Sequence, residues 1–297
     1  MNTGIVYATL GFVLWGLVPL YLRQVVSVAP LEVVLHRSVW SLVFLFSMLA
    51  LLRRFDWLRQ LVAQPRRLGL FALSALLLSV NWLVYVFAVH SGHVVDASLG
   101  YFINPLVNVL LGVLVLHERL RRVQWTAVGL AALGVLWLTA QAGRVPWIAL
   151  VLAFSFGLYG LMRKTATLGA LEGLALETLL LAPVVVPLLA WWTWQGDGAM
   201  ARGDAALNGW LLLSGPLTAL PLLLFAAGAR RLPLSTIGLL QYISPTIQLA
   251  LGIWVFGEPF DRDRFVGFAL IWSALALVSV DGWQSARRDA SAKRHRF

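Results

Sequence analysis

The chain has 297 residues, of which 60% are hydrophobic and only 12% are charged, and its formal net charge is +10. Because a soluble domain carries about 25% charged residues, this composition excludes a soluble globular protein and predicts a multi-pass membrane protein. The absence of cysteine excludes disulfides and thiolate nucleophiles. We expect no nucleic-acid partner, because the basic residues flank apolar stretches and form no recognised nucleic-acid-binding motif.

Apolar stretches long enough to cross a bilayer follow one another along the chain. A span needs about 20 mostly apolar residues, and in lipid it must be a helix, since an isolated strand would leave its backbone unpaired. The first stretch lacks a basic flank and a cleavage site, so we expect it to be retained. The sequence therefore predicts an all-α membrane protein with ten transmembrane helices, at about 4–22, 31–52, 67–89, 95–116, 123–141, 145–162, 171–193, 208–229, 236–256 and 262–282.

Lysine and arginine are distributed unevenly between the loops. If the N-terminus is cytoplasmic, 17 of them fall in inside loops and the tail, and 5 fall in outside loops. Since cytoplasmic loops carry the excess of basic residues, both termini are predicted to be cytoplasmic, although Arg23 on the outer flank of the first span argues weakly the other way.

Two stretches 140 residues apart resemble each other. Ile103–Glu118 and Ile243–Glu258 are identical at 6 of 16 positions, including one proline, one glycine and the final glutamate. Because each half would hold five spans, an odd number, the second half must insert upside down. We predict a five-helix repeat at 1–142, its inverted copy at 143–283, and a basic cytoplasmic tail at 284–297 that is disordered.

A proline lies inside each copy of this motif, and amide or hydroxyl residues flank it. Pro105 frees the carbonyl of Tyr101, and Pro245 frees that of Gln241. One interpretation is a helix break whose polar groups line a cavity near the membrane midplane. The alternative is a kink that only shapes helix packing.

Three of the ionisable residues within predicted spans are candidates for charge recognition or coupling: His36, Arg37 and Glu177. A charge near the bilayer centre costs about 2.5–3.5 kcal/mol. Arg37 could face the interior and attract an anion or pair with a carboxylate, or it could extend to the headgroups. Glu32 and His36 are four residues apart, so a local pair could hold them.

Other polar residues allow both functional and structural interpretations. Asn81 could bond a neighbouring helix or touch a solute, and Arg163 and Lys164 are most simply residues that set the topology. Small residues recur on the fifth and tenth spans, which predicts a scaffold and allows a homodimer contact there. His90, His93 and Asp96 have a spacing that could hold a metal, but the loop around them is short, and we predict no metal and no cofactor.

Several blocks of sequence resemble the RarD group of permeases, in the EamA family of the drug/metabolite transporter superfamily. They are Trp15–Tyr21, His36–Arg37, Asn81–Trp82, Ala97–Asn108, Phe154–Gly160, Leu234–Gly238 and Gln241–Pro245. The resemblance covers about residues 3–285. It implies ten helices in two inverted halves, a cavity lined mainly by spans 1, 3, 4, 6, 8 and 9, a bacterial inner membrane and transport of small organic solutes, often outward.

From the residues and the resemblance together we expect a secondary transporter, an exporter of metabolites, amino acids or amphipathic drugs, and not an enzyme. The alternatives are a membrane enzyme acting on a lipid-linked substrate and a non-transporting sensor or partner. The expected partners are the solute and the lipid bilayer. The residues expected to contact the solute are Trp15, Asn81, Tyr101, Asn104, Asn108, Tyr159, Gln241, Tyr242 and Gln248.

Overall fold

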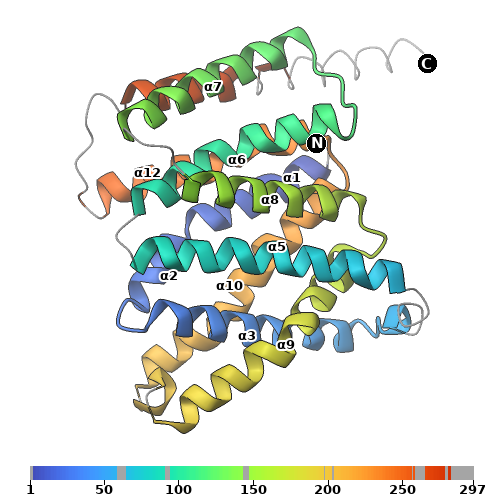
Figure 1. Cartoon of the computed structure of the whole chain (residues 1–297), viewed down its shortest axis with the longest axis vertical. Coiled ribbons are helices and arrows are strands. Elements are labelled where there is room, and N and C mark those ends of the chain that lie inside the picture. Colours follow the sequence, from blue (N-terminus) through green and yellow to red (C-terminus); the bar gives the residue numbers. More distant parts are fainter. Residues whose placement is uncertain are drawn as a thin grey trace, which may run out of the picture.

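The regular structure in the described part of the chain is entirely helical, as predicted (Figure 1). The computed structural model describes residues 3–58, 65–90, 94–142, 147–196, 198–202, 204–255, 257, 265–277 and 280–281. The helices are α1 (Thr3–Gly16), α2 (Val18–Gln24), α3 (Pro30–Leu51), α5 (Pro65–His90), α6 (Val94–Leu114), α7 (Arg122–Ala142), α8 (Trp147–Thr165), α9 (Ala170–Trp194), the 3-10 helix η1 (Ala199–Arg202), α10 (Ala205–Ala229), α11 (Leu234–Gln241) and α12 (Ile243–Trp254).

Within these residues, eight helical stretches are long and apolar enough to cross a membrane. Two shorter apolar helices, Leu99–Leu114 and Phe265–Leu277, stand where the fourth and tenth spans are predicted. A multi-pass helical membrane protein is thus confirmed at this coarser level. Glu258 and the 284–297 tail lie outside the described residues.

Contacts between the helix connections define two opposite faces. On the face that we call the basic face, Arg54 pairs with Glu172 at 3.5 Å, Arg230 donates to the carbonyl of Leu168, and Arg121 pairs with Asp281 at 2.6 Å. On the other face, the α2–α3 face, the Glu32 carboxylate accepts from the Ala199 backbone N–H at 2.6 Å, above a cluster formed by Val25, Val28, Val33, Ala199, Leu207 and Leu211. Gly4 packs against Leu232, so the N-terminal end of α1 lies on the basic face. Asp281, among the last described residues, lies there too, through its pair with Arg121.

Each helix of the first half has an equivalent in the second half. When every helix is replaced by its equivalent, the pairs that pack together stay the same. The pair α6–α8 corresponds to α12–α1, α5–α8 to α10–α1, and α3–α10 to α9–α5. The pairs α3–α9 and α6–α11 each join equivalent helices. This is the pattern that an internal two-fold relation produces.

Helix α7 and the helix Phe265–Leu277 lie together at one edge of the molecule (Figure 1). Their small residues face each other: a Cβ on Gly134 would lie 2.7 Å from the Gly267 carbonyl oxygen. Ala127, Ala131 and Ala274 are buried in the same contact. Gly134, Gly267 and Ala274 therefore pack within one chain, whereas nothing lies within 4 Å of a Cβ on Gly129. The homodimer stays a prediction.

The two proline motifs differ in their backbone. The second motif has its break at Tyr242, between α11 and α12, three residues before Pro245. The helix break predicted at Pro105 is wrong, because α6 is one continuous helix through it. A proline removes only one helical hydrogen bond, and α6 is held by α8 and α11, which both pack against it. The first span also has an unpredicted break, at Leu17 between α1 and α2.

A glycine sets the distance between α3 and α10. A Cβ at Gly215 would lie 2.3 Å from the backbone carbon of Trp40, and Ser41 donates to the Gly215 carbonyl at 3.1 Å. We expect Gly215→Ala to lower the free energy of unfolding by about 1–3 kcal/mol, the usual effect of overpacking. Gly209→Ala on the same helix is the control, since nothing lies within 4 Å of its Cβ. Unfolding in detergent measures both; equal melting temperatures would contradict the prediction.

Candidate functional site

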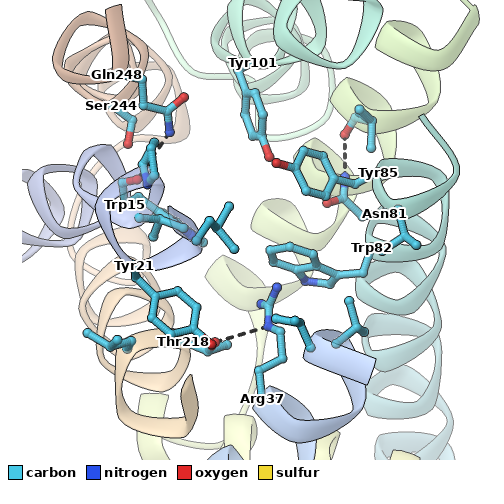
Figure 2. Close-up of a pocket in the computed structure, with 18 of the residues that line it drawn as sticks. Trp15, Tyr21, Arg37, Asn81, Trp82, Tyr85, Tyr101, Thr218, Ser244 and Gln248 are labelled. Carbon is cyan, nitrogen blue, oxygen red and sulfur yellow. Dashed lines mark hydrogen bonds between the residues drawn. The ribbon is translucent and has the colours of Figure 1, made fainter. Parts of the chain in front are cut away.

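A cavity of about 320 Å³ lies between the helices (Figure 2). It extends to the loop that joins α2 and α3, where Val25, Val26 and Val28 line it. Its volume is at the lower end of the range of about 300–1,000 Å³ for small-molecule sites. Its walls come from α1, α2, α5, α6, α8, α10, α11 and α12, as expected from spans 1, 3, 4, 6, 8 and 9. Helix α3 also contributes Val33, Val34 and Arg37. The resemblance did not imply this helix, but an inward-facing Arg37 was one of the two interpretations of the sequence.

Arg37 is the most unusual residue of the cavity wall. Its guanidinium carbon lies 3.1 Å from the centroid of the Trp82 ring, and its Nε donates to Thr218 Oγ1 at 3.1 Å. Figure 2 shows it between Tyr21 and Trp82, below Tyr85 and Tyr101. The side chain therefore faces the cavity, and its charge is held by a ring and a hydroxyl.

Amides from both proline motifs meet at the deep end of the cavity. Asn108 Nδ2 donates to Gln241 Oε1 at 2.7 Å, and lies 3.5 Å from Asn104 Oδ1. Asn104 and Gln241 line the cavity, whereas Asn108 is buried behind them. The Asn108–Gln241 bond ties α6 to α11, so Gln241 both lines the wall and holds the two helices together.

Two further polar residues of the wall bond to backbone carbonyls of α1. Ser244 donates to Phe12 at 2.7 Å, and Gln248 donates to Trp15 at 3.3 Å. Asn81 likewise lines the cavity but donates to Leu152 O and Ser155 Oγ on α8, both at 2.9 Å. Asn81 therefore both bonds a neighbouring helix and lines the cavity, so both interpretations of this residue apply.

Aromatic rings close the cavity on the side of the basic face. Trp15 and Phe156 have their centroids 5.3 Å apart, and Phe156 lies 5.3 Å from Phe225. Phe12 packs on Trp15 and Phe225, and Tyr159 stacks on Phe225 at 6.2 Å. We call these five residues the aromatic layer. Tyr159, predicted to contact the solute, is fully buried in it and does not line the cavity.

A buried ion pair lies next to the aromatic layer. Arg163 Nη1 is 3.4 Å from Glu177 Oε1, and both side chains are at most 1% exposed. The carboxylate also accepts from Ser74 at 2.6 Å and from Tyr159 at 3.4 Å, and Arg163 donates to the carbonyl of Ala170 at 3.1 Å. The interpretation of Arg163 as a residue that only sets topology is incomplete, because it neutralises a charge that the sequence left without a partner.

Glu118 joins the end of α6 to the start of α11. Its carboxylate accepts from the backbone N–H groups of Leu234 and Ser235, at 2.6 and 3.0 Å, and from Ser235 Oγ at 2.7 Å. An acceptor at a helix N-terminus satisfies donors that have no partner in the helix. Lys164 lies 3.8 Å from this carboxylate and donates to the carbonyls of Ala229 and Leu232. We call Glu118, Lys164 and Ser235 the basic-face latch.

His36 lies away from the cavity and belongs to a local pair. Its Nδ1 accepts from Trp40 Nε1 at 3.3 Å, and its Nε2 lies 3.6 Å from Glu32 Oε1. Tyr242 is also buried, with its hydroxyl on the Phe102 carbonyl at 3.2 Å. The structure thus brings eight predicted residues to the cavity wall, namely Trp15, Arg37, Asn81, Tyr101, Asn104, Gln241, Pro245 and Gln248, and places six elsewhere, namely His36, Pro105, Asn108, Tyr159, Glu177 and Tyr242.

The comparison with protein families decides what kind of protein holds this cavity. The model of the EamA-like transporter family matches the chain twice, over residues 2–140 and 145–280. The chain belongs to the EamA-like transporter family. The RarD-type resemblance is confirmed by full-length relatives: Protein RarD of Streptomyces exfoliatus is 46% identical over 97% of this chain and 91% of its own, and Protein RarD of Escherichia coli is 41% identical over 96% of both.

Other relatives of this EamA protein are named only as transporters. One is the uncharacterized transporter YojE of Bacillus subtilis, which is 46% identical over 96% of this chain and 97% of its own. A solved structure titled "Crystal structure of protein" superposes with a TM-score of 0.72, covering 94% of this chain and 97% of its own at 17% identity. That likeness supports the fold alone. The family and the relatives together make this EamA protein a membrane transporter.

Sequence reasoning missed Tyr21 and Thr218 on the cavity wall and the role of Glu118. Tyr21 and Thr218 carry no signal, because a span that is apolar all round does not reveal which side faces a cavity. Glu118 did carry a signal, because a glutamate recurs at the end of both copies of the proline motif, 13 residues after each proline.

Proposed function

We propose that this EamA protein is a secondary carrier that exports small organic solutes across the bacterial inner membrane by alternating access. The observation that carries the proposal is the cavity, which reaches the α2–α3 face and stops at the aromatic layer. A site that is open to one side and closed to the other is what such a carrier requires in each of its two open states.

The proposal includes ten spans in two inverted halves with both termini in the cytoplasm. It is supported by the two family matches, one in each half, and by the helix pairs that exchange with each other. The basic face carries Arg53, Arg54, Arg119, Arg121, Arg122, Arg230 and Arg231. Since basic loops stay inside, the basic face is cytoplasmic and the cavity is open to the outside.

Two groups of helices are proposed to move apart at the basic face when the cavity opens to the cytoplasm. One group is α5, α6 and α8, and the other is α1, α10 and α11. The aromatic layer joins α8 to α1 and α10, and the basic-face latch joins α6 and α8 to the start of α11. The Asn108–Gln241 bond, at the deep end of the cavity, would serve as the pivot.

Counterflow in proteoliposomes tests the carrier function. Vesicles holding the purified protein and one unlabelled solute from a broad metabolite panel should take up the same labelled solute faster than protein-free vesicles. Leu217→Trp is the matched variant, because it places a large ring in the cavity wall without touching a polar contact. It should abolish the uptake. Uptake equal to that of protein-free vesicles for every solute would contradict the proposal.

A further inference from the structure

The charge of the cavity wall is positive and unmatched. Of the residues that line it, all in the described part of the chain, Arg37 is the one that carries a formal charge. The rest are apolar side chains, tyrosines, amides and hydroxyls. The acidic residue on the same helix α3, Glu32, is occupied by the Ala199 N–H and by His36. A cation in such surroundings is stabilised most by a ligand of opposite charge.

The way Arg37 is held leaves its hydrogen-bonding edge free. Thr218 takes Nε, and the Trp82 ring covers the guanidinium plane. Among the described residues no acceptor takes the two terminal nitrogens. A guanidinium presents these nitrogens as a planar fork that matches a carboxylate. The fork is also fixed in place, so little side-chain freedom is lost when a ligand binds.

The walls beside this fork are aromatic. Trp82 and Tyr85 have their centroids 5.8 Å apart, Tyr85 and Tyr101 are 6.2 Å apart, and Trp15 lies across from them (Figure 2). Aromatic faces and edges favour a flat apolar body between them, and the cavity volume of about 320 Å³ allows only a small one. An organic cation would meet the Arg37 charge with no carboxylate to offset the repulsion.

We propose that the cavity selects small organic monoanions, with one carboxylate on a flat apolar body, and that Arg37 is the residue that determines this specificity. The Arg37 guanidinium binds the carboxylate, and the rings of Trp82, Tyr85 and Tyr101 hold the apolar body. This inference rests on the proposed carrier function, because it names the solute class of the same cavity.

Three probes of the same shape and different charge test the specificity. They are 3-phenylpropionate, its neutral amide and the cation 3-phenylpropylamine, titrated calorimetrically into the full-length protein in lipid nanodiscs. The acid should bind at least about 10-fold more tightly than the amide, and the amine should bind most weakly. Arg37→Gln should weaken acid binding by about 10–100-fold, the usual effect of losing a charge-assisted hydrogen bond, and leave amide binding within about threefold. Arg37→Lys should recover part of the preference.

The outcome that overturns the inference is equal binding of acid and amide, an equal loss for both in Arg37→Gln, or no binding of the acid to folded protein. Unfolding curves establish that each variant is folded. Counterflow separates this failure from failure of the carrier function. If only the specificity is wrong, the panel solutes still exchange and Arg37→Gln leaves the order of preference unchanged. If the carrier function is wrong, the acid binds but no solute exchanges.

Discussion

Replacing Arg163 by Met should lower the free energy of unfolding by about 3–5 kcal/mol, the range measured when one partner of a buried ion pair is removed. The Glu177 carboxylate would stay buried at 1% exposure with only Ser74 and Tyr159 as partners. Denaturant unfolding in detergent measures the loss. Because the methionine fills much of the arginine volume, the loss reports the missing charge more than a cavity.

Two controls make this prediction specific. The double variant Arg163→Met/Glu177→Gln removes both charges and should recover most of the lost stability. Arg54→Met breaks the Arg54–Glu172 pair, in which the arginine is 63% exposed, and should change stability by less than about 1 kcal/mol. If Arg163→Met and Arg54→Met were equally mild, the Arg163–Glu177 pair would not be an important part of the fold.

Removing the Glu118 carboxylate should open the basic face. Glu118→Ala deletes the acceptor of three hydrogen bonds, to Leu234 N, Ser235 N and Ser235 Oγ. Bonds to a charged group contribute about 1.5–3 kcal/mol each, and loss of even one would shift an equilibrium between open and closed states by about tenfold or more. The chain has no cysteine, so Ala229→Cys adds a single thiol at a site that is 0% exposed. Its rate of labelling by a maleimide should rise about 10–100-fold in Glu118→Ala.

Two matched variants accompany this experiment. Glu118→Gln keeps one carbonyl acceptor and should give an intermediate labelling rate. Arg121→Ala breaks an exposed ion pair with Asp281 on the same face, outside the basic-face latch, and should leave the rate unchanged. A labelling rate that is the same in Glu118→Ala as in its parent would mean that Glu118 only caps α11 and does not hold the two helix groups together.

Composition and span length were enough to predict an all-helical membrane protein, because lipid allows few other structures. The observed α3, Pro30–Leu51, differs by one residue at each end from the predicted 31–52. The direction in which each residue faces was much harder to predict. Tyr101 and Tyr159 look equivalent in the sequence, but one lines the cavity and the other is buried in the aromatic layer.

The Arg163–Glu177 pair could have been predicted from depth alone. Consecutive spans are antiparallel, so residues at similar distances from their connection face each other. Arg163 precedes the turn at 166–169 by a few residues and Glu177 follows it by about two helical turns, a gap that the length of an arginine side chain can bridge. The backbone of the two proline motifs, in contrast, could not have been predicted from the sequence. Their sequences match, yet one helix is continuous at Pro105 and the other breaks at Tyr242, because the backbone depends on packing that the motif does not contain.

The aromatic layer has a consequence for the energy stored across the membrane that holds the protein. Phe12, Trp15, Phe156, Tyr159 and Phe225 offer ring faces and edges to anything that descends from the cavity. A hydrated sodium ion or a proton on water would have to shed its hydration shell to pass between them, which is very unfavourable in apolar surroundings. The resting protein is therefore expected to be electrically tight, so many copies can sit in an energised membrane without discharging it.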